Sequence, residues 1–394
     1  MQRIYADGKI DLPGGLPANW RRPAKIMNHR CPTRVIQLIN KIRSAVDGHE
    51  QKGRTDKETG SIRLFIVPAN TADKAKAEAA AAQRMAEITG DDCWGAAGPD
   101  FKTLTLEHLM AARRMGFVEF FEPLYSVDRL RTGLLDGSLP GLPFFTHDVM
   151  PLVEAKLRGD EYAVAAIVRQ RSPLLEKEFL KLSGSDQPKL LKAAREAVNE
   201  LIALWKGGAS PSLMDVLRCV QASGLFRIPE SLRLVVSSRD ATDEGMDKSN
   251  SSALSDEKRD EAIEAWEQSL SAPFQQVVSY ARYISGEAPF DTHQGVKGLE
   301  FPRVMVIIDD DESRGFLFSY DKLLGAKAKS DTDISNERAG KETTIDRTRR
   351  LFYVTCSRAE SSLAIVHYSS DPVKVKDHAV AEGWFEAGEI EIIE

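Results

Sequence analysis

The sequence lacks three features that would assign a protein to a class at once. Its four cysteines are scattered and form no C-x-x-C pair, which disfavours both a zinc site and a disulfide framework. It has no apolar run long enough to span a bilayer and no apolar signal core at its N-terminus. It also lacks an excess of basic residues, because its formal net charge is -6. We therefore expect a cytoplasmic protein without a membrane partner, in which any nucleic-acid contact is local.

The chain is long enough for two or three domains, since 394 residues with 42% hydrophobic content can bury more than one core. After Pro32, apolar residues recur at helical spacing as far as Val46. The β-branched run 62–67 predicts a strand, and the alanine-rich segment 75–89 predicts a helix that Gly90 ends. The first part of the chain therefore predicts a helix, a strand and a helix.

The middle of the chain, from 107 to about 284, has mostly helical patterning interrupted by proline and glycine. Residues 102–106 come just before it and are compatible with a strand. The apolar residues of 232–236 also predict a strand, and a long helix is expected across 257–284.

The last hundred residues return to an alternation of helices and strands. We expect strands at 304–308 and 363–368, a polar loop across 322–343 and a helix across 347–357. The order of α/β, helical and α/β regions predicts one open-sheet α/β domain that is interrupted by a helical insertion.

Two segments carry a chemical pattern, and the first is residues 292–301, with the sequence THQGVKGLEF. Gly298 permits a tight turn, and Lys297 and Glu300 place opposite charges on that turn. The apolar run 304–308 follows at once and would hold the turn rigidly. This pattern is typical of a loop at a strand edge that contacts a ligand.

The second segment is residues 349–359, with the sequence RRLFYVTCSRA. Its apolar residues can face a core while its arginines project from a helix and from the end of that helix. Arginine suits phosphate because its planar fork makes paired, charge-assisted hydrogen bonds and keeps its proton. We interpret this segment as a candidate phosphate contact.

The two segments resemble motifs V and VI of UvrD/Rep-type superfamily 1 DNA helicases, whose patterns are T-x-H-x-x-K-G-L-E-F and R-R-L-x-Y-V-x-x-T-R-A. Two more segments fit the same order. Residues 2–5, QRIY, are similar to the Q-x-I-Y of motif III, and residues 28–30, NHR, are similar to the N-Y-R of motif IV. The resemblance covers 1–46 and about 285–368, and it implies that the chain is the C-terminal half of such a helicase.

The resemblance also implies a fold, namely a RecA-like parallel-sheet domain of the P-loop NTPase type that serves as the second motor domain. It divides the chain into a remnant of the first RecA-like domain, the two parts of the second one, a mostly helical insertion domain and a C-terminal tail. These are residues 1–20, 21–100 with 285–372, 101–284 and 373–394.

In this family the matching residues surround ATP, which is bound with Mg²⁺. The resemblance implies that Gln2 senses the γ-phosphate and that Arg30 and Arg358 reach it from the second domain as catalytic arginines. Such arginines offset charge on the transferring phosphoryl group and are worth roughly 10³ to 10⁵ in rate. Gly298 and Glu300 would border the nucleotide, with Glu300 at its sugar. No metal ligand within this chain is implied.

The resemblance further implies a DNA contact from the same loop, made by Thr292, His293 and Lys297. The partner would be single-stranded or partially duplex DNA, which crosses both RecA-like domains.

The sequence contains no G-x-x-x-x-G-K-[ST] loop, so it offers no backbone cradle for the phosphates of ATP, and we expect no ATP hydrolysis by the chain alone. The run 304–310 imitates a Walker B strand. Because it directly follows the segment similar to motif V, we interpret Asp309 and Asp310 as a solvated strand end instead.

The sequence begins at Met1, directly before Gln2, inside the segment similar to motif III. We expect either a truncated or misassigned start or a separate upstream polypeptide, which would make an upstream helicase half or an accessory protein a partner. An alternative reading is a non-enzymatic module that binds DNA or a partner protein and keeps only the scaffold of the motor.

Overall fold

The computed structural model describes most of the chain, namely residues 26–46, 50–56, 58–95, 99–176, 187–243, 253–313 and 317–393. The chain divides into two compact units. One unit consists of the residues up to Arg114 and from Pro289 onward, and the other is Met115–Ala288. Gln2 and the segment similar to motif III lie outside the described residues.

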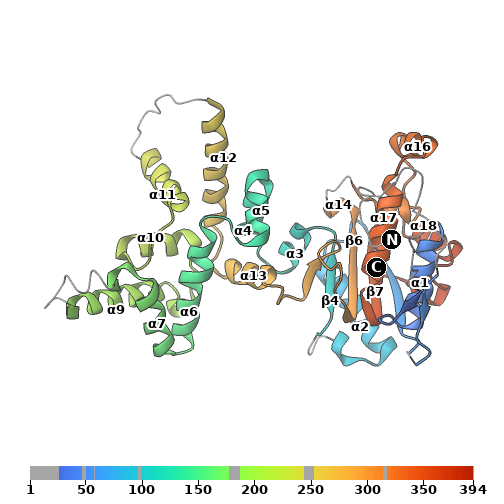
Figure 1. Ribbon diagram of the computed structural model, residues 1–394, viewed down its shortest axis with the longest axis horizontal. Coiled ribbons are helices and arrows are strands. Elements are labelled where there is room, and N and C mark those ends of the chain that lie inside the picture. The colour runs from blue at the N-terminus through green and yellow to red at the C-terminus, as the bar shows by residue number, and fades with distance from the viewer. Residues whose placement is uncertain are drawn as a thin grey trace, which may run out of the picture. The chain divides into compact units, whose positions relative to one another are not determined.

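Within the described residues, the first unit is built around a six-stranded parallel sheet with the order β5-β4-β6-β7-β3-β8 (Figure 1). A parallel pair, β1 and β2, lies outside this sheet. The strands are β1 (Met27–Asn28), β2 (Lys52–Gly53), β3 (Ser61–Pro68), β4 (Lys102–Thr105), β5 (Phe290–Thr292), β6 (Phe301–Asp309), β7 (Ala359–Ser369) and β8 (Ile390–Ile392). The α/β fold class and the strands expected from the sequence in this unit are confirmed.

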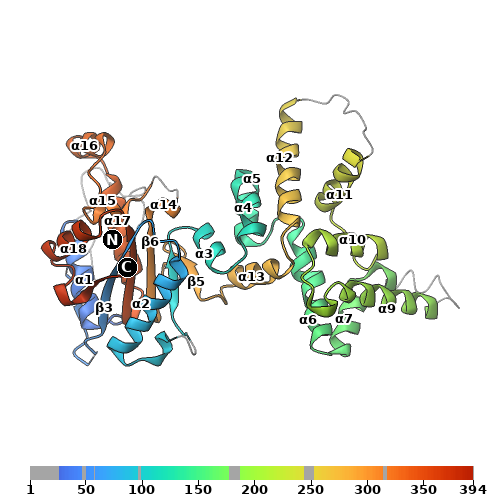
Figure 2. The ribbon, with the colours of Figure 1, turned by 180° about the vertical axis from the view of Figure 1, so that it is seen from behind.

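Helices cover both faces of the sheet, as Figure 2 shows from behind. α2 packs against β3 and β7, and α1 and α18 contact the same two strands. α17 packs on α1. Because parallel crossovers are right-handed, α2 lies on one face and α17 and α18 on the other. The helices are α1 (Thr33–Ser44), α2 (Lys74–Thr89), α3 (His108–Arg114), α14 (Asp310–Ser313), α15 (Tyr320–Leu323), α16 (Asp331–Arg338), α17 (Thr344–Cys356) and α18 (Pro372–Ala381).

The two central strands are apolar on both sides because both faces of the sheet are covered. In β6, residues 304–308 are at most 2% exposed, and in β7 residues 363–366 are fully buried. Each large apolar side chain buried in this way contributes about 1.5–3 kcal/mol. This rigid centre fixes the positions of the loops that precede β6 and β7.

The second unit is helical among its described residues. Its helices are α4 (Val118–Ser126), α5 (Asp128–Asp136), a π-helical turn (Phe144–Val149), α6 (Met150–Leu157), α7 (Glu161–Arg171), α9 (Gln187–Ala203), α10 (Leu213–Ser223), α11 (Glu230–Asp243), α12 (Ala253–Leu270) and α13 (Gln275–Ile284), with short 3₁₀ turns at Pro173–Leu175 and Lys206–Gly208.

Two expectations for this unit are wrong. Residues 232–236 lie within α11 and form no strand, because Leu232, Val235 and Val236 have the i, i+3, i+4 spacing of a helix and are all buried. The long helix expected across 257–284 is broken near Pro273 into α12 and α13, since proline removes a backbone donor.

In the first unit, the segment 322–343 is not a plain loop, because it contains α16. Ser330 caps this helix in a reciprocal box with Asp333. The carboxylate of Asp333 is 2% exposed and accepts a hydrogen bond of 2.6 Å from Lys322. A polar sequence therefore forms a helix here through its cap and a buried ion pair.

The sheet also extends past the boundaries expected from the sequence. β4 lies between β5 and β6, although the expected insertion domain starts at residue 101. The expected tail 373–394 contains most of α18 and also β8, which pairs with β3. These strands are only four and three residues long, so their sequences gave little sign of where they pair. No helix in the described ranges combines the length and apolar character needed to cross a membrane.

Candidate functional site

Arg30 lies in the short loop between β1 and α1, and Asn28 shapes that loop. The side-chain oxygen of Asn28 accepts hydrogen bonds from the backbone N–H groups of Arg30 and Cys31, at 3.0 and 2.9 Å. Asparagine commonly makes such local bonds in turns. Its amide nitrogen also donates to Gln51, at 2.9 Å. The segment similar to motif IV therefore presents Arg30 from a loop that its own asparagine holds in shape.

The segment similar to motif V joins the end of β5 to the start of β6. Gly298 has a φ of +94°, a conformation that favours glycine, so the tight turn expected there is confirmed. Val296 is buried beneath the turn and its carbonyl accepts from the N–H of Leu299, at 3.0 Å. Lys297 and Glu300 are exposed on the turn. The loop thus directs its two charged side chains to solvent.

Arg358 lies between α17 and β7, and its side chain is almost completely buried, at 1% exposed. Its guanidinium donates to the carbonyl of Val354 at 2.8 Å, to that of Leu299 at 2.9 Å and to that of Val296 at 3.5 Å. A fourth bond, of 2.8 Å, goes to the hydroxyl of Ser357. Most of the donors of this arginine are therefore used within the protein.

Arg30, Glu300 and Arg358 come together at the edge of the sheet where β6 and β7 begin. The Nε of Arg30 donates to a carboxylate oxygen of Glu300 at 2.5 Å, and a terminal nitrogen donates to the carbonyl of Ser357 at 3.3 Å. Burial and, to a smaller extent, the positive charge of Arg30 together lower the pKa of Arg358 to about 10. Arg358 still carries its proton at neutral pH. Residues far apart in sequence thus form one charged cluster.

The side chains of this cluster differ in how much of their surface is exposed to solvent. The side chains of Arg30 and Glu300 are 25% and 51% exposed, whereas Arg358 lies beneath them. Arg30 can exchange its carboxylate partner for another anion without unfolding anything. Arg358 could bind an anion only after breaking its bonds to backbone carbonyls. Each buried carbonyl left unpaired in this way costs about 1–3 kcal/mol.

Thr292 and His293, the two residues matched to a DNA contact at the start of this loop, are buried in the structure. His293 is fully buried, with Nε2 3.2 Å from the carbonyl of Leu104 and Nδ1 3.2 Å from the hydroxyl of Tyr320. Burial lowers the pKa of His293 to about 3, so the ring is neutral at pH 7. Thr292 is 5% exposed and its hydroxyl accepts from the N–H of Gly295. Of the three matched residues, Lys297 is the exposed one.

The acidic end of β6 is not the solvated strand end that the sequence suggested. Asp309 is 3% exposed and pairs with Lys74 at 2.6 Å. Asp310 accepts from the backbone N–H groups of Tyr320 and Asp321, both at 3.0 Å, and so caps α15. Both carboxylates therefore have structural partners that lie elsewhere in the sequence.

Sequence reasoning missed the contribution of main-chain atoms to the cluster. The carbonyl of Ser357 accepts from both Arg30 and Cys31, and the carbonyls of Val296 and Leu299 accept from Arg358. Nothing in the residue types indicates this role. Among the described residues, no group of three or more histidine, cysteine, aspartate or glutamate side chains could hold a metal ion.

In comparisons with known proteins, no family model matches the chain and no curated protein matches it.

Proposed function

We propose that this chain is the C-terminal portion of an ATP-dependent DNA helicase or translocase of the UvrD/Rep type. In this proposal its α/β unit is a RecA-like second motor domain and its helical unit is the insertion domain. One observation carries the proposal. The segments that resemble motifs IV, V and VI, which begin at Asn28, Thr292 and Arg349, meet at one edge of the sheet. They bring Arg30, a partly exposed arginine, to the surface there.

The chemistry of this edge fits part of a nucleoside triphosphate. Arg30 offers a partly exposed guanidinium that can bind a phosphate oxygen, and Glu300 can accept a hydrogen bond from a sugar hydroxyl. Gly298 shapes the turn that carries Glu300, and Lys297 on the same turn offers a positive charge to a DNA backbone. The role proposed for Gln2 concerns a residue outside the described ranges.

The remaining phosphate contacts must come from another protein segment in this proposal. The sequence contains no P-loop, and the described residues contain no acidic cluster that could hold Mg²⁺. A P-loop supplies backbone N–H groups and a lysine to the phosphates, and ATP supplies the phosphoryl group that is transferred to water. This chain would add Arg30 to that arrangement from the opposite side.

The test is DNA-stimulated ATP hydrolysis, measured for the chain alone and for the chain combined with a P-loop segment. The segment to use is one encoded directly upstream in frame or by a neighbouring gene. We expect no hydrolysis by the chain alone and DNA-stimulated hydrolysis by the combination. R30Q should then lower the rate by about 10³-fold or more.

R54Q is the matched control, because Arg54 is an exposed arginine that pairs with its near neighbour Asp56 and lies outside the cluster. It should hydrolyse ATP like the wild type. Hydrolysis by the isolated chain, or equal rates for R30Q and R54Q, would overturn the proposal.

The alternative function, a non-enzymatic module that binds DNA or a partner protein, is favoured by one observation. Thr292, His293 and Arg358, three of the residues matched to ligand contacts, are buried and bonded within the protein. If the alternative holds, single-stranded DNA or a protein will bind the chain and no P-loop segment will restore ATP hydrolysis.

A further inference from the structure

Arg358 bonds to the residues on both sides of Glu300. Its guanidinium donates to the carbonyl of Leu299, the residue before Glu300, at 2.9 Å. Its backbone carbonyl accepts from the N–H of Phe301, the residue after Glu300, also at 2.9 Å. Both peptide neighbours of Glu300 are therefore tied to one residue, and the direction in which the Glu300 side chain leaves the backbone depends on that residue.

The same residue stabilises the last turn of α17. The Nε of Arg358 donates to the carbonyl of Val354, and a terminal nitrogen donates to the hydroxyl of Ser357. The carbonyl of Ser357 in turn accepts from Arg30. The partners of Arg30, a carboxylate at one loop and a carbonyl at the other, are thus both attached to Arg358.

We propose that Arg358 is a positioning residue that fixes the Gly298–Glu300 turn to the end of α17 and so sets the geometry of Arg30 and Glu300, without itself touching a ligand. The positioning of the loop involves residues of this chain only and does not depend on any ligand. Its consequence for phosphate binding rests on the function proposed above.

The residue type fits this role. An arginine has five N–H donors in a fixed planar fork, and four bonds from this guanidinium reach three carbonyls and one hydroxyl. A lysine has three donors at a single point and cannot reach carbonyls of both the loop at Leu299 and helix α17 in this way. A methionine keeps the apolar stem and loses every donor.

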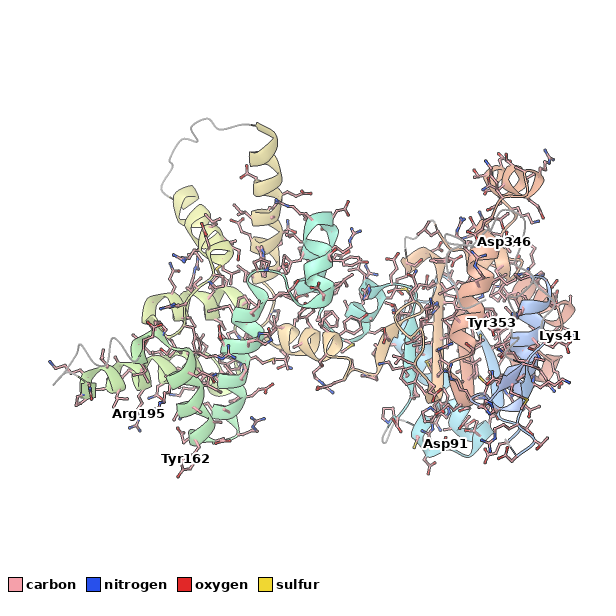
Figure 3. The ribbon with its side chains drawn as sticks, viewed as in Figure 1. Lys41, Asp91, Tyr162, Arg195, Asp346 and Tyr353 are labelled. Atoms are coloured by element: carbon pink, nitrogen blue, oxygen red, sulfur yellow. The ribbon has the colours of Figure 1, made fainter. Side chains whose placement is uncertain are left out.

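The experiment measures amide hydrogen exchange in the full chain for the wild type, R358K and R358M. The amides of Leu299 and Phe301 should exchange slowly in the wild type, about tenfold faster or more in R358M, and at an intermediate rate in R358K. R303K and R303M are the matched controls. Arg303 is a half-buried arginine near the same end of β6, and it pairs with Asp91, which is labelled in Figure 3.

The controls should leave the exchange of Leu299 and Phe301 at the wild-type rate. If R358M also leaves these two amides as slow as in the wild type, Arg358 does not position the loop and the proposal is overturned.

A second readout is the affinity of the same variants for inorganic triphosphate, used as the probe. If R358M loses both amide protection and at least tenfold in affinity while R303M loses neither, the positioning role is supported. If R358M loses affinity with the loop still protected, Arg358 touches the anion directly and the proposal is overturned. It is also overturned if protection is lost while the affinity stays equal to that of the wild type.

The failure of the proposed function would look different. If the wild-type chain binds no triphosphate while R358M still loosens the loop, the positioning of the loop by Arg358 is supported and the nucleotide function is not. Should R358M fail to fold, nuclear magnetic resonance of the wild type replaces it. The Nε–H of Arg358 should then exchange slowly with water and keep its chemical shift on addition of triphosphate, whereas that of Arg30 should shift. A directly contacted Arg358 would shift as well, and that would overturn the proposal.

Discussion

Charged side chains at the two edges of the central sheet differ in how deeply they are buried and in how many partners they have. At the edge where the strands end, Glu312 pairs with Lys74, Arg113 and Arg114, within a network in which Arg114 also pairs with Glu78. The side chains of Glu312 and Arg114 are only 9% exposed. Burial raises the pKa of Glu312, but the bonds from Arg114 and Lys74 outweigh burial and bring the pKa below its usual value. At the edge where the strands begin, Arg30 and Glu300 form a pair whose side chains are 25% and 51% exposed.

This difference indicates which edge can accept a ligand. Parallel α/β sheets usually bind ligands at the carboxyl ends of their strands. Here that end is filled by acids and bases that neutralise one another, and Tyr368 adds a hydrogen bond to Glu78. The amino end carries Arg30, whose acidic partner Glu300 is half-exposed and can be replaced by another anion. Charge alone is therefore a poor guide to a binding site, and exposed charge with few partners is a better one.

The largest effect should come from breaking the buried ion-pair network at the edge where the strands end. E312Q removes the carboxylate that Lys74, Arg113 and Arg114 share, so that Asp309 and Glu78 are left to compensate Lys74 and Arg114. We expect the free energy of unfolding to fall by about 3 kcal/mol, because breaking a buried ion pair on one side costs that much. Urea denaturation at neutral pH measures it.

D311N is the neighbouring control, since the Asp311 side chain is 72% exposed and pairs loosely with Lys327. Its cost should stay below about 1 kcal/mol. Equal costs for the two variants would show that the network adds no stability beyond that of a surface pair.

An intermediate effect should appear as a pH dependence that His293 causes. The pKa of this ring is about 3 in the folded chain, because it is buried, against about 6.5 when unfolded. Between these values the unfolded state binds more protons, so stability falls as the pH is lowered from 6.5 towards 3. The slope from this residue is about 1.4 kcal/mol per pH unit.

H293Q removes that contribution and should flatten the dependence by about this amount in the same window. The comparison uses the slope of the free energy of unfolding between pH 6.5 and pH 4.5, and not its absolute value. Identical slopes for the wild type and H293Q would mean that the ring is protonated or solvated in the folded protein.

The smallest effect on stability should come from the pair of Arg30 and Glu300, at the edge where the strands begin. E300Q breaks a pair whose carboxylate is 51% exposed, so the free energy of unfolding should change by less than about 1 kcal/mol. Arg30 then loses a competing acid, and the affinity for inorganic triphosphate should rise by up to about fivefold. Isothermal titration at low salt measures this rise, and about 1 M salt should abolish it through screening. Weaker binding by E300Q would contradict the idea that Glu300 competes with the anion.

The sequence predicts the centre of the α/β unit well, for reasons that are local. β3, β6 and β7 are β-branched or apolar runs, and α1 and α17 have one apolar face. Such patterns report burial directly, because a strand covered on both faces has to be apolar throughout. α1 and α17 pack together, and Figure 3 labels Lys41 on the first and Tyr353 on the second.

The candidate site was predictable only in part. The resemblance selected Arg30, Glu300 and Arg358, and the structure brings these three together. The resemblance did not indicate that His293 would be buried, because its hydrogen-bond partner Leu104 lies 189 residues earlier in the sequence. Partners at such separations, and bonds to main-chain carbonyls, depend on how the chain folds and not on neighbouring residue types.

The position of β7 has a consequence for how the protein folds during synthesis. β7 lies between β6 and β3, although it is made after both of them. Until residue 369 has left the ribosome, β3 and β6 each present an unpaired edge, and unpaired edges are prone to association with other chains. The helical residues 115–288 make many local contacts and can order sooner. A nascent chain stopped before β7 should therefore need protection by chaperones, although it already contains α17 and Ser357, the residue to which Arg30 is bonded.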